Sequence, residues 1–344
     1  MSRTNTTSKI ILVTGATGKQ GRATISALRN GPSAQQYHIL GLTRNASSSG
    51  AKKLVVDFPE GFAVVEGDLN SYESIRDVFE RSNREDGGIW GVFAVFAYAG
   101  LGNDASGEER QGKILARVAH EYDVGSFIYS SAERAGEMFD DEAMPGSSHV
   151  AKVQIEKRVM ELGVSWTILR PTYFMENFEG HLGGLAWSIF SAGMSPTSAL
   201  HLIAVDDIGR AAAGVFQNPE PFRSQVLVLQ GDMLTSSKQD EAYHRVEGRS
   251  LSSVPIWVAR GILAINVHLQ EMINMFDKTS VVIAEGKVPE LRGQLDLGRQ
   301  AIMLDGSKPM TFEEWILTSM HVRVREDNAR WNKVSMFNLF TGRH

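Results

Sequence analysis

Residues 13–21 read VTGATGKQG, and three glycines in this stretch, Gly15, Gly18 and Gly21, are spaced three residues apart. An apolar, β-branched run, KIILVT (9–14), comes directly before the glycines, and a segment with helical periodicity follows them. Glycine allows the sharp turn from strand to helix and lets the backbone approach a ligand closely. The N-terminus of the helix then offers free N–H groups and a positive dipole end to a phosphate. The stretch therefore predicts a turn that binds the pyrophosphate of a dinucleotide.

Two other interpretations of the glycine stretch were weighed. A nucleoside-triphosphate loop requires Ser or Thr after its lysine, whereas Gln20 follows Lys19, so that class of site is excluded. A tight turn without any ligand is the remaining alternative.

Short apolar runs alternate with segments of helical periodicity through about the first 230 residues. The predicted strands are 9–14, 37–43, 62–67, 91–96, 125–131, 164–170 and 225–230. The predicted helices are 21–29, 71–82, 107–122, 150–163 and 205–219. Apolar strands that alternate with helices indicate a parallel sheet covered on both faces. The sequence therefore predicts an α/β fold with a doubly wound, parallel Rossmann sheet.

The alternating pattern weakens after about residue 231. Residues 256–276 are apolar and are predicted to be helical. Thr311 with Glu314 three residues later is the capping-box signature of another helix. Earlier in the chain, Asp206 is predicted to cap the helix that begins beside it.

The composition excludes several classes of site. The 344 residues include no cysteine, so disulfides, thiolate metal sites and a Cys nucleophile are excluded. No two of the nine histidines lie within four residues of each other, and no Gly-X-Ser-X-Gly motif occurs. The net charge of −5 gives no field that would attract nucleic acid or an anionic membrane. With no signal peptide or apolar run of spanning length, we expect a cytoplasmic protein, possibly also nuclear, without a metal.

The end of the second predicted strand indicates which dinucleotide binds. NAD enzymes usually carry an acid there for the ribose 2′-hydroxyl, but this chain carries Arg44. A guanidinium pairs with a phosphate, and Lys52 and Lys53 add positive charge nearby. These residues favour NADP(H) over NAD(H), and the alternative is a solvated basic loop. Asp68, after the third strand, is either a contact of the adenine or a turn residue.

Five stretches taken together, VTGATGKQG, LTRN, EGDL, FIYSSAE and LRPTYFMENF, resemble the NmrA-like family. That family belongs to the atypical short-chain dehydrogenases and is related to isoflavone reductases. The resemblance covers roughly residues 9–320 and implies a Rossmann core with a smaller, mixed C-terminal lobe. The implied core is about 9–170 and 200–230, and the implied smaller lobe is about 171–199 and 231–320. Residues 1–8 and 321–344 are then tails.

The resemblance also implies a cofactor site in the cleft between the two parts. By position, the pyrophosphate meets the glycine turn, Arg44 meets the 2′-phosphate, and the segment from Tyr173 closes over the nicotinamide. The implied NADP(H) site comprises Gly15, Ala16, Thr17, Gly18, Lys19, Gln20, Gly21, Arg44, Asp68, Leu69, Phe96, Ala97, Tyr98, Lys152, Tyr173, Phe174, Met175, Glu176 and Asn177.

The residues for catalysis depart from the usual pattern of short-chain dehydrogenases. Those enzymes use Tyr and Lys four residues apart on one helix, with Tyr passing a proton to the substrate. This chain has Lys152, but Ser148 stands where Tyr is expected. Three roles for Lys152 remain open: the acid or base itself, a ligand of the nicotinamide ribose only, or a surface ion pair with Glu156. His149 or Tyr173 is an alternative proton donor, or else a pocket wall.

Two functions follow from these observations. The first is an NADP(H)-dependent oxidoreductase that reduces a small-molecule substrate by hydride transfer. The second is a redox sensor without catalysis, in which NADPH/NADP⁺ occupancy changes the affinity for a regulated protein partner. The missing Tyr favours the sensor. Lys152 and the aromatic residues Tyr173, Phe174, Phe178 and Trp187 favour a substrate pocket, although a core would use the same aromatics. The tail 321–344 either packs on its own domain or docks on a partner.

Overall fold

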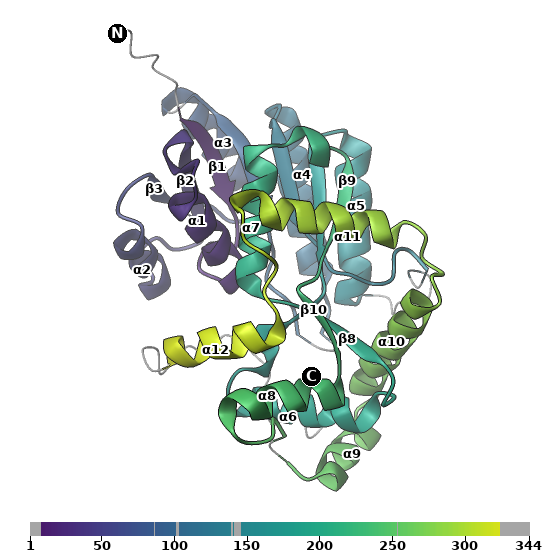
Figure 1. Cartoon of the computed structure of the whole chain (residues 1–344). Coiled ribbons are helices and arrows are strands. Elements are labelled where there is room, and N and C mark those ends of the chain that lie inside the picture. The colour runs from purple at the N-terminus through teal and green to yellow at the C-terminus, as the bar shows by residue number, and fades with distance from the viewer. Residues whose placement is uncertain are drawn as a thin grey trace.

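A sheet of seven parallel strands runs through the computed structural model (Figure 1). The structure describes residues 8–85, 87–100, 103–138, 140, 146–252 and 254–323. Side by side, the strands are β3 (Phe62–Glu66), β2 (Tyr37–Thr43), β1 (Lys9–Val13), β4 (Ile89–Ala94), β5 (Ser126–Ser130), β6 (Trp166–Pro171) and β9 (Gln225–Leu229). The strand order reverses between β1 and β4, so ligands are expected at the carboxyl ends of these strands. The predicted doubly wound parallel sheet is confirmed.

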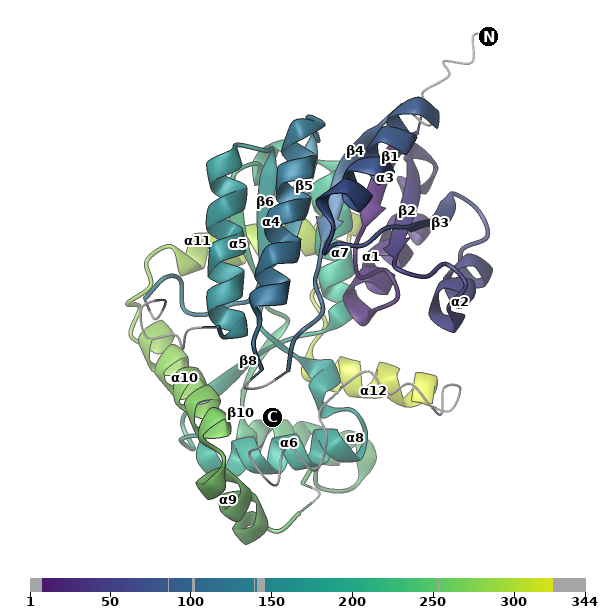
Figure 2. The same ribbon diagram turned by 180° about the vertical axis from the view of Figure 1, so that it is seen from behind.

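Helices cover both faces of this sheet. One face carries α1 (Lys19–Asn30), α7 (Val205–Gln217) and α11 (Leu291–Ile302) (Figure 1). The other carries α3 (Tyr72–Glu85), α4 (Ser106–Glu121) and α5 (Ser148–Leu162), with α4 and α5 side by side (Figure 2). Strand β1 shows why the strand sequences are apolar throughout. Ile11 and Val13 join the core under the first face, whereas Ile10 and Leu12 join the core under the second.

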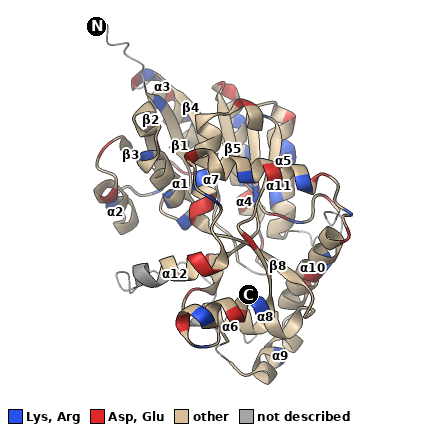
Figure 3. Ribbon diagram, viewed as in Figure 1, with Lys and Arg blue, Asp and Glu red and all other residues tan. Residues whose placement is uncertain are grey.

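A smaller lobe lies at the end of the sheet and is built around a three-stranded mixed sheet (Figure 1). Its strands are β7 (Tyr173–Phe174), β8 (Ala199–Ile203) and β10 (Asp232–Thr235). Its helices are α6 (Gly180–Gly193), α8 (Ser236–Glu247), α9 (Ile256–Ile265), α10 (Val267–Ala284) and α12 (Phe312–Arg323). Helix α6 contains no charged residue, whereas Figure 3 shows charged residues on α8 and α12 of the same lobe. A third apolar core fills the lobe.

The remaining elements are short. Helix α2 (Ser49–Asp57) lies beside the edge strand β3, and the 3₁₀ turns are η1 (Ala34–Gln36), η3 (Met175–Phe178), η4 (Glu220–Phe222) and η5 (Met303–Asp305). The predicted tails lie outside the described residues, apart from residue 8 and residues 321–323.

The helical prediction for 256–276 is confirmed, and the segment forms two helices, α9 and α10, which meet at Asn266. The side chain of Asn266 is 2% exposed and accepts a hydrogen bond of 3.1 Å from the N–H of Leu269. This contact caps α10 and starts a new helix in the middle of an apolar run.

The prediction that Asp206 caps α7 is wrong. The helix begins after Ala204, and the N–H of Val205 donates to the Glu176 carboxylate, at 3.0 Å. The cap therefore comes from a residue far earlier in the chain. The capping box at the start of α12 is confirmed, because Thr311 and Glu314 exchange side chain-to-backbone hydrogen bonds.

Helix α11 packs against the large sheet, although the implied smaller lobe included its residues. A Cβ on Gly298 would lie 2.1 Å from the carbonyl oxygen of Val228 in β9. A Cβ on Gly214 of α7 would lie equally close to the carbonyl oxygen of Ala301. The two glycines thus allow the backbone of α11 to pack directly against the backbones of β9 and α7. Conversely, β8 belongs to the small sheet, although residues 200–203 were assigned to the core.

Candidate functional site

The glycine turn is held in place at the carboxyl ends of β1 and β4. Thr14 donates its hydroxyl to the carbonyl of Val95 and accepts the N–H of Val95, both at 2.8 Å. Gly15 has a φ of +56°, and the N–H of Gly18 donates to its carbonyl at 2.8 Å. A Cβ on Gly21 would lie 2.3 Å from the carbonyl oxygen of Gly15. The first and third glycines are therefore required by the turn itself.

The start of α1 faces the ends of two further segments. Gly18 has no side chain to cap this helix, so a phosphate could take the place of a capping group at its N-terminus. Lys19 forms an ion pair of 2.5 Å with Glu179, which precedes α6. Gln20 accepts a hydrogen bond of 2.6 Å from Ser130 at the end of β5. The turn, β5 and the smaller lobe are thus brought together at one point.

Arg44 follows the last residue of β2 and is exposed. Hydrogen bonds from Asn70, and then the charge of Arg44, lower the pKa of Asp68, so the two predicted residues lie near each other. The Asp68 carboxylate accepts both the backbone N–H and the side-chain amide of Asn70, at 3.0 and 2.9 Å. These contacts support the turn interpretation of Asp68. Leu69 next to it packs against the apolar core under α3 and α4.

Helix α2 begins shortly after Arg44. Ser48 caps this helix by accepting the N–H of Ala51 at 3.3 Å. A Cβ on Gly50 would contact Thr17 at 3.3 Å, so α2 lies directly beside the glycine turn. Ala16, within the turn, is 1% exposed and belongs to the core.

The three residues predicted after β4 project from the same edge of the sheet. Phe96 packs against Tyr129 with ring centroids 5.9 Å apart, and Ala97 is exposed. The Tyr98 side chain is 56% exposed. Partial desolvation, and then the charge of Glu108, raise the pKa of Tyr98. Glu108 is therefore a neighbour of this edge.

Lys152 forms its ion pair with Glu108 of α4, and the interpretation that it pairs with Glu156 on its own helix is wrong. The Glu156 carboxylate is taken by two arginines instead. Ser148 donates its hydroxyl to the second oxygen of Glu108 at 2.8 Å. The two residues at the positions of the usual Tyr and Lys thus share one carboxylate.

Glu156 lies at the centre of a buried ionic network that supports helix α5. Arg134 donates to both of its carboxylate oxygens, at 2.9 and 2.7 Å, and Arg170 does so at 3.2 and 2.7 Å. Arg134 also pairs with Asp140, whose carboxylate contacts His149 at 3.0 Å. His149 therefore faces this network, and its contact supports the interpretation as a wall residue.

Residues 173–177 join the large sheet to the smaller lobe. The Tyr173 ring packs against Phe178, Phe190 and Phe276, with centroids 5.2–5.7 Å away. Desolvation raises the pKa of Tyr173, and the nearby Tyr98 raises it further. A hydrogen bond with Asn177 acts in the opposite direction and lowers this pKa. The tyrosines of the β4 and β6 ends thus approach each other. Phe174 contacts the core under α1 and α7, and Met175 is fully buried.

Glu176 is 8% exposed and uses one carboxylate oxygen for two hydrogen bonds. That oxygen accepts the N–H of Val205 at 3.0 Å and the indole N–H of Trp315 at 3.1 Å. The other oxygen has no hydrogen-bond partner among the described residues. Burial raises the pKa of Glu176 to about 7. Its side chain therefore ties α7 and α12 together.

We expect Glu176→Gln to be more stable than the wild type at pH 8 and equally stable at pH 4. The folded protein holds the Glu176 proton more tightly than the unfolded chain, whose glutamate has a pKa of 4.5. Stability should therefore fall as pH rises from about 4.5 to 7, by at most about 3 kcal/mol. The amide keeps both accepted hydrogen bonds and carries no charge. Urea unfolding at the two pH values measures the difference.

The matched control for this comparison is Glu220→Gln, because the Glu220 side chain is 73% exposed. Its stability should differ from that of the wild type by less than about 0.5 kcal/mol. If the difference in stability between Glu176→Gln and the wild type does not change with pH, the ionisation of the buried Glu176 carboxyl is not its cause.

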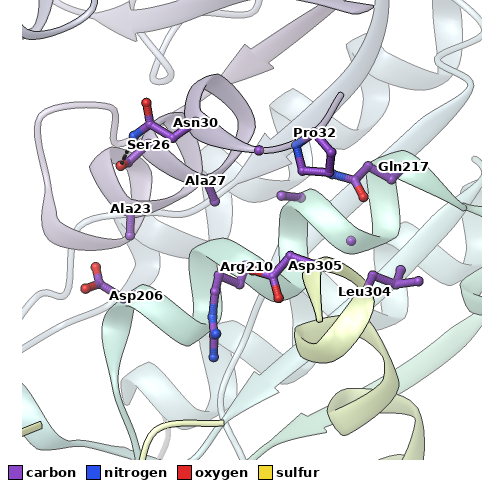
Figure 4. Close-up of a pocket in the computed structure, with 13 residues that line it drawn as sticks. Ala23, Ser26, Ala27, Asn30, Pro32, Asp206, Arg210, Gln217, Leu304 and Asp305 are labelled. Carbon is purple, nitrogen blue, oxygen red and sulfur yellow. Dashed lines mark hydrogen bonds between the residues drawn. The ribbon is translucent and has the colours of Figure 1, made fainter. Parts of the chain in front are cut away.

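A pocket of about 280 Å³ lies between α1, α7 and η5, away from the predicted site (Figure 4). Its polar lining includes Asp206, Arg210 and Asp305. Arg210 is occupied by Asp207, at 2.5 Å, and by the carbonyl of Lys308, at 2.8 Å. None of the residues implied for the cofactor lines this pocket.

Within the described part of the chain, no three His, Asp or Glu side chains are grouped so that they could hold a metal ion. Among the same residues, no helix has the length and apolar character needed to cross a membrane.

Three further residues lie at the carboxyl edge of the large sheet although the sequence does not single them out, namely Glu108, Ser130 and Glu179. Glu108 resembled an ordinary acid in the first turn of a helix, where the dipole accounts for it. Its low exposure, 5%, is what distinguishes it, and local sequence carries no signal of that burial.

The parallel sheet, its strand order and the glycine turn define a Rossmann-type protein. A side chain at Gly15 or Gly21 would lie within 3 Å of neighbouring protein atoms, so only glycine permits this tight turn into α1, and Gly18 provides no capping side chain. The turn therefore fits a dinucleotide pyrophosphate. The sequence pattern of the NmrA-like family matches residues 7–316, and the chain belongs to that family.

Similar proteins include both oxidoreductases and a regulator. The NmrA-like family domain-containing oxidoreductase ptmS of Penicillium ochrochloron is 24% identical over 270 residues, 73% of this chain and 76% of that one. The structure of NmrA, a negative transcriptional regulator, in complex with NADP has a TM-score of 0.62 at 19% identity, over 93% and 99% of the chains. The NADPH complex of the quinone oxidoreductase QOR2 from Escherichia coli has a TM-score of 0.62 at 18% identity, over 90% and 99%. At these identities the solved structures establish the shared fold.

Proposed function

We propose that this protein binds NADP(H) and reduces a small metabolite. The observation that carries the proposal is the meeting of three features at one sheet edge: the glycine turn, Arg44 and Lys152. The turn leads into α1, whose N-terminus has no capping side chain at Gly18 and could bind a pyrophosphate, and Arg44 follows β2, where a guanidinium would select the 2′-phosphate. The NADP(H) complexes of NmrA and QOR2, which share the fold, support the same cofactor.

NADPH, when bound, supplies a hydride from C4 of its nicotinamide. The residues of the chain would bind and orient the reactants. The Lys152 amine has three N–H donors, and its bond to Glu108 uses one of them. The other two are available for the nicotinamide ribose or the substrate oxygen. Tyr98 and Tyr173 would form the walls beside them, and the aromatic core of the smaller lobe would exclude water.

A redox sensor is the second candidate, and the contact of Ser148 favours it. Ser148 replaces the usual Tyr, and its hydroxyl is donated to Glu108 rather than toward a substrate. A protein with this arrangement could bind both cofactor states and discriminate between them without turnover. The regulator NmrA has the same fold.

Lys152→Ala separates the two candidates. The purified protein is mixed with NADPH and a panel of enones, ketones and quinones, and the loss of nicotinamide absorbance is followed. We expect turnover with at least one acceptor and a loss of about 100-fold in kcat for Lys152→Ala, the range for removing a general acid or an orienting contact. Lys157→Ala is the matched control, because Lys157 is exposed on the same helix.

Tight binding of NADPH without turnover of any acceptor would contradict the enzyme and favour the sensor. A cofactor-dependent protein partner would then be expected in a pull-down with each nicotinamide state.

A further inference from the structure

Glu108 is a buried glutamate in a place where a glutamate is usually exposed. It lies in the first turn of α4, and its side chain is 2% exposed. Its neighbour Glu109 shows the ordinary case, because it is 30% exposed and pairs with Lys113 one turn later on the same helix. Burial of a carboxylate is costly unless its oxygens are bound. The partners of Glu108 should therefore reveal its role.

Both oxygens of Glu108 bind residues of the neighbouring helix α5. One oxygen binds the Lys152 amine, and the other accepts the Ser148 hydroxyl at 2.8 Å. Ser148 and Lys152 are four residues apart, so both project from one face of α5. One carboxylate from α4 thus spans the two positions at which short-chain dehydrogenases carry Tyr and Lys.

The close packing of α4 on α5 brings the Glu108 carboxylate within bonding distance of α5. A Cβ on Gly112, one turn after Glu108, would lie 2.5 Å from the Ile155 side chain. The missing side chain lets the helices approach closely, at a point one turn beyond Lys152. The charge of Glu108 also affects two tyrosines at the sheet edge. Desolvation is the main cause that raises the pKa of Tyr98 and of Tyr129, and the negative charge of Glu108 raises both further.

We propose that Glu108 is a positioning residue, which holds the Lys152 amine at the sheet edge in the orientation that meets cofactor and substrate. Lysine has a long, flexible side chain, and an amine that is already immobilised loses less entropy when it binds. The role of Glu108 is thus exerted through Lys152. The inference rests on the proposed oxidoreductase function for its kinetic consequences, but the contact itself can be tested without turnover.

The kinetic test compares Glu108→Gln with Glu109→Gln, its neighbour in the same turn. We expect Glu108→Gln to lower kcat about 10- to 100-fold while KM for the acceptor changes less than about 3-fold. Glu109→Gln should match the wild type. In the double variant with Lys152→Ala, Glu108→Gln should cause no further loss, because Glu108 acts only through that lysine. An equal, independent loss in both backgrounds would overturn the proposal.

The second measurement requires no activity. Lys152 is labelled with an amine-reactive reagent in the full-length protein, and the modified peptide is quantified by mass spectrometry. Glu108→Gln removes the partner that shields the amine, so Lys152 should be labelled several-fold faster while Lys157 is unchanged. Unchanged labelling of Lys152 in folded protein would overturn the proposal. If the wild type turns over no acceptor, the proposed function fails and the labelling alone decides the role of Glu108.

Discussion

Replacing Glu156 by alanine should lower the free energy of unfolding by about 3–5 kcal/mol, the usual cost of removing one partner of a buried ionic network. Glu156 is 3% exposed, and its carboxylate is bound by Arg134 and Arg170 through four hydrogen bonds. Arg170 is 2% exposed and Arg134 is 5% exposed. Removing the carboxylate would leave both guanidinium groups buried with too few acceptors. Urea unfolding at pH 7 measures the loss.

Glu161→Ala is the matched control, because Glu161 lies on the same helix with its side chain 65% exposed. It should change the stability by less than about 0.5 kcal/mol. A loss below about 1 kcal/mol in Glu156→Ala would show that the arginines find other acceptors at little cost.

The ionic network around Glu156 also makes the stability of the fold depend on pH below about pH 5. Burial alone would raise the pKa of Glu156, but the hydrogen bonds from Arg134 and Arg170 lower it to about 2. The unfolded chain, with a pKa of 4.5, takes up this proton first as pH falls. The contribution of Glu156 is therefore complete above about pH 5 and is lost between about pH 5 and 2. Glu156→Ala should lack this part of the acid dependence.

Arg44→Asp should weaken binding of NADPH about 100-fold and change binding of NADH only a few-fold. A charge-assisted bond between guanidinium and phosphate contributes about 1.5–3 kcal/mol, and a carboxylate in its place repels the phosphate. About 2.7 kcal/mol corresponds to a 100-fold change in Kd. NADH lacks the 2′-phosphate, and a carboxylate after β2 is the usual partner of its ribose hydroxyls. Fluorescence titration of the free protein with each cofactor measures both constants.

Arg292→Asp controls for the change in net charge, because Arg292 is an exposed residue of α11. It should leave the binding of both cofactors unchanged. If Arg44→Asp weakens NADH as much as NADPH, Arg44 does not contact the 2′-phosphate, and the preference for NADP(H) loses its basis.

Local patterns predicted the large sheet because each strand and helix is encoded within a few adjacent residues. In β1, an unbroken apolar run is buried on both faces, and the glycine turn follows directly. The site at the carboxyl ends of the strands follows from the same order. The smaller lobe was predicted less well, since α6 is rich in glycine and α8 is mostly polar. Neither shows a clear helical stripe.

Contacts between distant segments account for the errors. The spacing of Lys152 and Glu156 suggested a pair, but Arg134 and Arg170 reach Glu156 from other segments, and Glu108 reaches Lys152 from α4. A one-dimensional pattern contains no record of these partners. Helix spacing alone therefore identified the lysine but not the residue that holds it.

The path of the chain limits how this protein can change during evolution. After β6 the chain enters the smaller lobe, returns for α7 and β9, and enters the lobe again from β10 to α10. It then returns for α11 and enters the lobe a third time with α12. The lobe is thus built from three separate chain segments, and α11, which covers a strand of the large sheet, lies between the second and the third of them. No single stretch of gene encodes either part. New ligand preferences must therefore arise by substitutions within the lobe, since the lobe cannot be exchanged as one cassette.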